Sequence, residues 1–147
     1  MHHHLAQINI ARLLAPVDDP LIAEFVAQIP AINALAEGSP GFVWRLQSDA
    51  GNAIDVSYDD DPLIIVNMSV WESVAALREF SYRSQHAGVF RERGKWFEKM
   101  EAAHMCLWWI PVGSVPTVPE GKARLEHFRK FGPTAMAFSF ARVFEPE

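Results

Sequence analysis

The sequence contains a single cysteine, Cys106, which excludes an internal disulfide. It has no apolar run of the roughly 20 residues that cross a bilayer, and it does not begin with a basic region followed by a long apolar one. There are 13 lysines and arginines against 18 aspartates and glutamates, and no basic stripe is present to neutralise phosphates. We therefore expect a cytoplasmic protein that binds neither nucleic acid nor membrane.

Motifs that carry the common chemistries are also missing. The sequence has no glycine-rich phosphate loop, nucleophile elbow or zinc motif. His104 and His127 stand apart from His86, without the spacing of metal ligands. Clustered carboxylates such as Asp59-Asp60-Asp61 can bind hard cations, but a run that precedes Pro62 is more typical of a solvated turn. We predict no metal site.

What is present indicates one folded domain over residues 1–147. Half of the residues are hydrophobic and 12% are aromatic, which is enough for a real core. Alternating apolar residues predict four strands, at 5–12, 42–47, 63–71 and 105–112. Helical spacing predicts helices at 20–36, 74–82 and about 87–103, a further helix between Thr117 and Gly132, and a last strand at 137–143. Asp19 and Thr117 are the expected N-caps of the first and last helices.

The order of the first six elements is strand, helix, strand, strand, helix, strand. This order predicts an α+β fold with an antiparallel sheet, the ferredoxin-like split βαβ arrangement, with both helices on the same face. The strands are apolar on both faces, because adjacent residues such as Trp108 and Trp109 point to opposite sides. Something must cover the second face, and a second copy is the simplest cover. We therefore expect a homodimer that closes into a barrel.

Two amides interrupt the apolar strands. Asn9 and Asn67 lie in the first and third strands, which are neighbours at the centre of this topology. Buried amides need hydrogen-bond partners. The two side chains either bond each other for structural reasons or line a pocket, since pockets are mostly apolar with a few placed polar groups.

Several sequence segments together resemble the domain-of-unknown-function family numbered 3291. They are HLAQINIA, GFVWRLQ, NMSVWES with YRSQH, KWFE, LWWIPVG and GPTAMAFSF, and they cover nearly the whole chain. That family is similar to the dimeric α+β barrel superfamily, which includes cofactor-free monooxygenases of antibiotic biosynthesis and haem-degrading enzymes. The resemblance implies the barrel dimer, but one fold hosts many functions, so it does not imply a reaction.

A polar segment, Arg83-Ser84-Gln85-His86, lies at the expected break after the second helix and is the candidate site. His86 is the candidate catalytic base, because its unperturbed pKa is near neutrality. Arg83, Arg91 and Arg93 would keep it neutral and are available to bind an anionic group. The residues predicted to bind a ligand are Asn9, Trp44, Asn67, Trp71, Arg83, Phe90 and Trp96.

Three functions remain open at this point. The first is a dimeric barrel that binds a small apolar or aromatic molecule, without a cofactor. The second is a cofactor-free monooxygenase-like enzyme that acts on an aromatic or polyketide-like substrate, with His86 as the base. The third is a haem-binding or haem-degrading protein, with His86 as the iron ligand, as the superfamily resemblance implies.

Overall fold

The computed structural model describes residues 2–49, 51–86 and 94–146, apart from the side chains of residues 85 and 86. The strands are β1 (His3–Arg12), β2 (Phe42–Arg45), β3 (Ile64–Trp71) and β4 (Met105–Pro111). The helices are α1 (Ala23–Glu37), preceded by the 3-10 turn η1 (Pro20–Ile22), α2 (Val74–His86) and α3 (Val118–Phe131). Within the described part of the chain, none of the helices has the length and apolar character needed to cross a bilayer.

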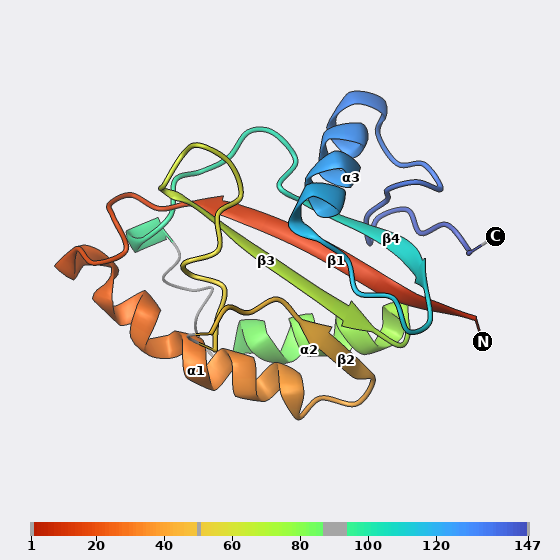
Figure 1. The fold of residues 1–147 in the computed structure, drawn as a ribbon, viewed down its shortest axis with the longest axis horizontal. Helices are drawn as coiled ribbons and strands as arrows, with labels where there is room; N and C mark the ends of the chain where they lie inside the picture. The colour runs from red at the N-terminus through yellow and green to blue at the C-terminus, as the bar shows by residue number, and fades with distance from the viewer. Residues whose placement is uncertain (1, 50, 87–93, 147) are drawn as a thin grey trace.

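The four strands form one antiparallel sheet in the order β2-β3-β1-β4, so β1 and β3 are central, as predicted. Figure 1 shows α1 and α2 on one side of this sheet and α3 on the other. The predicted α+β class and the ferredoxin-like arrangement are therefore confirmed. The helices also begin where expected: the Asp19 carboxylate accepts from the Leu21 N–H at 2.9 Å, and the Thr117 hydroxyl accepts from the Glu120 N–H at 3.2 Å.

The helix predicted from residue 87 to 103 is wrong over its described part. Gly94 and Lys95 lie in a 3-10 turn, and Phe97 forms an isolated antiparallel bridge with Leu13. The Leu14 N–H donates to the Trp96 carbonyl, and the Glu98 N–H donates to the Arg12 carbonyl, both at 2.8 Å. Pairing with the chain that continues β1 therefore replaces the helix, a tertiary contact that helical spacing does not reveal. Residues 87–93 lie outside the described residues.

The predicted last strand at 137–143 is also wrong. Phe138 forms one isolated bridge with Leu107 of β4, with hydrogen bonds of 2.7 and 2.9 Å, and the chain then turns away. The Trp109 indole N–H donates to the Phe144 carbonyl at 2.7 Å, which holds the turned segment against β4. Phe138, Phe140 and Phe144 of this segment pack with the apolar cluster that contains Trp71 and Leu77. We call residues 138–144 the strap, because this segment folds over the sheet without adding a strand.

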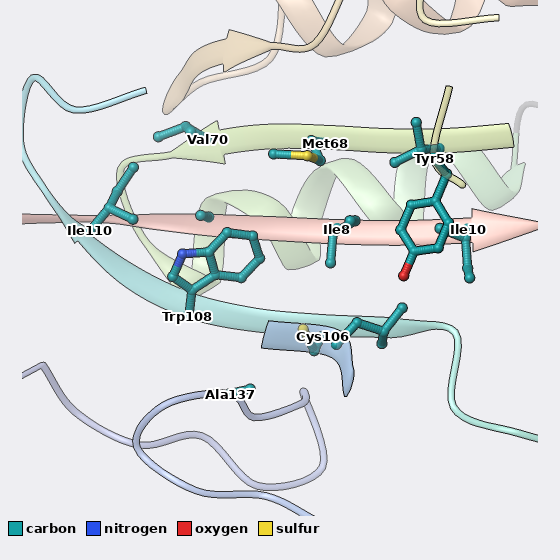
Figure 2. Packing of buried hydrophobic residues seen from close by; sticks show 12 residues of the cluster. Ile8, Ile10, Tyr58, Met68, Val70, Cys106, Trp108, Ile110 and Ala137 are labelled. Atoms are coloured by element: carbon teal, nitrogen blue, oxygen red, sulfur yellow. The ribbon is translucent and has the colours of Figure 1, made fainter. Parts of the chain in front are cut away.

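The sheet face opposite α1 and α2 is covered by the same chain. Its buried side chains come from β1, β3 and β4 and include Ala6. Figure 2 shows others of this cluster on neighbouring strands, with Tyr58 near Ile10: Ile8, Met68, Val70, Cys106, Trp108 and Ile110. The helix α3 approaches so closely at Gly121 that a Cβ there would lie 2.8 Å from the Ile8 Cδ1. A second copy was expected to cover this face, but α3 and the segment around Tyr58 do so. A homodimer remains a prediction, and one built on this face requires α3 to be displaced.

Candidate functional site

The face beneath α1 and α2 carries two apolar clusters. One contains Trp71 of β3 and Leu77 of α2, and the other contains Trp96 with Ile65 of β3 packed against it. Side chains alternate along a strand, so the positions between these clusters on the same face belong to two residues of β1 and two of β3. All four residues are polar: Gln7, Asn9, Asn67 and Ser69. We call them the amide network.

The amide network is joined by short hydrogen bonds. The Gln7 side-chain N–H donates to the Asn67 Oδ1 at 2.7 Å and to the Ser69 hydroxyl at 2.8 Å. The Asn9 Nδ2 donates to the Gln7 Oε1 at 3.0 Å and to the Asn67 Oδ1 at 3.2 Å. The Trp71 indole N–H adds a bond to the Ser69 hydroxyl at 2.8 Å. The mutual hydrogen bond between Asn9 and Asn67 is thus confirmed, within a larger network than expected.

The network is buried at one end and open at the other. Gln7 is 3% exposed and Ser69 is 6% exposed, whereas Asn67 is exposed although it lies in a central strand. The last paired residue of β2 is Arg45, opposite Ser69, so Asn67 has no residue of β2 paired with it. The Asn67 Nδ2, the Asn9 Oδ1 and the Ser69 O–H make no bond to another described residue. The network therefore presents two donors and one acceptor that are held in place but not used within the described chain.

The structure brings together three of the predicted ligand-binding residues and separates the others. Asn9, Asn67 and Trp71 meet in or beside the amide network, and the Trp71 ring is stacked on Phe80 of α2 with the ring centres 5.0 Å apart. Trp96 is buried in the other apolar cluster, against Phe25.

Two other predicted residues lie elsewhere. Trp44 packs on the opposite face of the sheet, with the cluster that α3 covers. Arg83 is on the exposed surface of α2, where its Nε donates to the Glu79 carboxylate at 3.1 Å. His86 is the last residue of α2, but its side chain is outside the described residues, as are Phe90, Arg91 and Arg93. The predictions for these four positions remain predictions.

The acidic run before β3 is a turn, as expected. The Asp59 carboxylate accepts from the Asp61 N–H, and the Asp61 carboxylate accepts from the Leu63 N–H, both at 2.9 Å. The Arg12 Nε donates to the Asp61 carboxylate at 2.8 Å, and a terminal nitrogen of Arg12 donates to the Glu98 carboxylate. The hydrogen bond from Arg12, and after it the one from the Leu63 N–H, lower the pKa of the Asp61 carboxyl below its usual value. The carboxylate thus fixes a turn and an ion pair.

Three residues of this region were missed from the sequence. Gln7 and Ser69 share a strand face with the predicted Asn9 and Asn67 at a spacing of two residues, so strand alternation was a usable signal. Arg45 has no such signal. Its side chain contacts Glu37 of α1, with 2.9 Å between the Arg45 Nε and the carboxylate, a pairing that depends on how the helix packs.

Fold and site define an α+β protein with a ferredoxin-like sheet that carries uncharged polar side chains beneath its helices. The family described as Domain of unknown function (DUF3291) matches residues 4–147, and this chain belongs to that family. The resemblance drawn from the sequence segments is thereby confirmed. No curated protein matches the sequence.

Solved structures with a related fold come from several bacteria. PA3566 from Pseudomonas aeruginosa aligns with a TM-score of 0.49 and 13% identity over 78% of this chain and 98% of the other. NE2512 from Nitrosomonas europaea, a protein of unknown function, aligns with a TM-score of 0.49 and 8% identity over 79% and 95%. SnoaB, a cofactor-independent oxygenase from Streptomyces nogalater, aligns with a TM-score of 0.45 and 16% identity over 79% and 97%.

Proposed function

We propose that this chain binds a small apolar or aromatic molecule beneath α1 and α2 and holds its polar group with the amide network. The observation that carries the proposal is Asn67, an exposed amide in a central strand. Its Oδ1 accepts from both Gln7 and Asn9, which fixes the side chain and leaves the Nδ2 donor available. Strand positions beneath helices are usually apolar, and ligand sites are mostly apolar with a few placed polar groups, so a row of four polar side chains here is expected to serve a ligand.

The unused groups indicate the chemistry of that ligand. The Asn67 Nδ2 and the Ser69 O–H suit an acceptor such as a carbonyl, and the Asn9 Oδ1 suits a hydroxyl donor. All members of the network are uncharged, and the neighbouring clusters are aromatic and aliphatic. An aromatic molecule that carries a carbonyl and a hydroxyl free to donate matches this arrangement.

The test uses meta-hydroxyacetophenone, whose hydroxyl cannot reach its own carbonyl, and its parent acetophenone as probes, titrated while the asparagine side-chain amide signals are followed by NMR. We expect the hydroxylated probe to bind more tightly and to shift the Asn67 signal. Asn67→Ala should weaken its binding by about 3- to 10-fold, the value of one neutral hydrogen bond. Gln47→Ala removes an exposed amide outside the network and serves as the control. Equal binding to the wild type and to Asn67→Ala would contradict the proposal.

A second candidate is a cofactor-free, monooxygenase-like reaction of such a substrate with oxygen. The donors on Asn67 and Ser69 are of the kind that stabilises the oxyanion of a deprotonated phenol. Amide, hydroxyl and indole groups do not accept a proton near neutral pH, so the base must lie outside the network, and His86 is the candidate. Oxygen uptake with a quinol under metal chelation tests this. His86→Ala should lower the rate by about 10²–10⁴-fold, and an unchanged rate would remove His86 from the reaction.

The haem alternative depends on the same residue. Added hemin should give a Soret band that His86→Ala abolishes if His86 ligates the iron. A hemin spectrum that is identical in the two proteins would remove this alternative and leave the cofactor-free readings.

A further inference from the structure

A hollow of about 240 Å³ lies between α1 and the end of β2. One wall is the α1 surface that includes Ile29, Asn33 and Glu37, and the other includes Arg45 of β2 and Asn52 of the following turn. Whole ligand pockets usually measure about 300–1,000 Å³, so this hollow has room for the head group of a small molecule.

Arg45 is the unusual member of this lining. Its side chain is only 12% exposed, yet its sole described partner is the Glu37 carboxylate at its Nε. The N–H groups of its two terminal nitrogens donate to no other described residue. Arg12 provides an internal comparison: its side chain is 39% exposed, and it donates to Asp61 from Nε and to Glu98 from a terminal nitrogen. The more buried guanidinium thus has fewer acceptors.

The two terminal nitrogens of a guanidinium present a flat edge of paired N–H groups that fits a carboxylate. Glu37 bonds the guanidinium at Nε, so the two terminal nitrogens are its free edge, and Arg45 is one of the residues that line the hollow. Asn33 and Asn52 add amide groups to the same lining.

We propose that this hollow is a carboxylate-binding subsite in which the terminal nitrogens of Arg45 bind a small organic acid. Glu37 holds the guanidinium from the Nε side and opposes a second carboxylate by its charge, so the affinity is a balance between the two residues. The subsite does not use the amide network. Benzoate binding is therefore expected to survive Asn67→Ala, which separates this inference from the proposed function.

The experiment titrates the full chain with benzoate and with benzamide, its uncharged counterpart, and follows the Arg45 Nε–H signal by NMR. Benzoate should shift this signal and benzamide should not. Arg45→Gln should weaken benzoate binding at least about tenfold, because a charge-assisted hydrogen bond is lost. Arg142→Gln removes the same charge from an exposed position on the C-terminal segment and should leave the affinity unchanged.

Glu37→Gln provides a second variant with the opposite expected sign. Removing the competing carboxylate should tighten benzoate binding by about 3- to 10-fold, which a purely structural ion pair does not predict. Benzoate that shifts signals without involving Arg45, or that binds Arg45→Gln as it binds the wild type, would overturn the inference. If Arg142→Gln weakens benzoate binding as much as Arg45→Gln does, the binding depends on the general surface charge and not on a subsite at Arg45, which would also overturn the inference.

Discussion

Gln7 of β1 and Ser69 of β3 face each other across the two central strands, and the Gln7 amide donates to the Ser69 hydroxyl at 2.8 Å. The Trp71 indole N–H donates to the same oxygen. One hydroxyl therefore satisfies donors from two strand positions in the buried end of the amide network. This arrangement fixes Gln7, which in turn fixes Asn67 at the open end.

Ser69→Ala should be more destabilising than its small change in volume suggests. It leaves one N–H of Gln7 and the indole N–H of Trp71 without their acceptor in a buried place. Each buried donor without a partner costs about 1–3 kcal/mol, so the two together should cost about 2–6 kcal/mol in the free energy of unfolding. Urea titration measures it, with the exposed Ser114→Ala as the control at less than about 0.5 kcal/mol. Equal losses in both variants would show that the hydroxyl is not an essential acceptor.

Gly121→Ala should destabilise the packing of α3 on the sheet. Its new Cβ would lie 2.8 Å from the Ile8 Cδ1 and 3.2 Å from the Met68 sulfur. Overpacking of this kind costs about 1–3 kcal/mol. Ile8→Val removes the clashing Cδ1, so Gly121→Ala should cost less in an Ile8→Val background. Thermal unfolding of the four proteins measures the coupling, and strict additivity would argue against a close contact.

Cys106 should be unreactive while the protein is folded. It is fully buried, and burial raises the pKa of its thiol to about 12. The thiolate is the reactive form, so a disulfide reagent at pH 8 should label Cys106 only after urea unfolding. Because the pKa of the Cys106 thiol is higher in the folded protein than its ordinary value of 9.0, the neutral thiol supports the folded state fully below about pH 9. The free energy of unfolding should then fall as the pH rises from about 9 towards 12. Rapid labelling without urea would contradict this burial.

The homodimer is tested by light scattering at micromolar concentration. The dimer prediction requires about twice the chain mass of 16.5 kDa. Since α3 covers the face that the second copy was expected to cover, a dimer must use another surface or displace this helix. A dimer whose association is unchanged by Gly121→Ala would favour another surface, and a mass of 16.5 kDa at all concentrations would contradict the prediction.

The sheet and the helix starts could be predicted from the sequence because local patterns determine them. Strand alternation located Asn9 and Asn67, and the capping residues located the helices that follow Asp19 and Thr117. Trp71 of β3 is fully buried, whereas Trp109 of β4 is half-buried.

The errors concern contacts between distant segments. The segment after Lys95 is set by pairing with the end of β1 and the residues that follow it, and the C-terminal segment is set by its single bridge to β4. The cover of the second sheet face was assigned to another molecule because the pattern shows that a face is apolar but not what lies on it. Arg45 was missed for a related reason, since the environment of its guanidinium is created by α1.

The bridge between Leu107 and Phe138 also affects how the protein behaves at high concentration. Unpaired backbone groups along an edge strand attract strands of other molecules and so promote aggregation. On the β4 side, Phe138 bonds the Leu107 N–H and carbonyl, and the rest of the strap packs over this edge. On the other side, β2 has only four residues and a register shift between Phe42 and Trp44. Removing the chain after Gly132 would expose the β4 edge, so the C-terminal segment protects this sheet from edge-to-edge association.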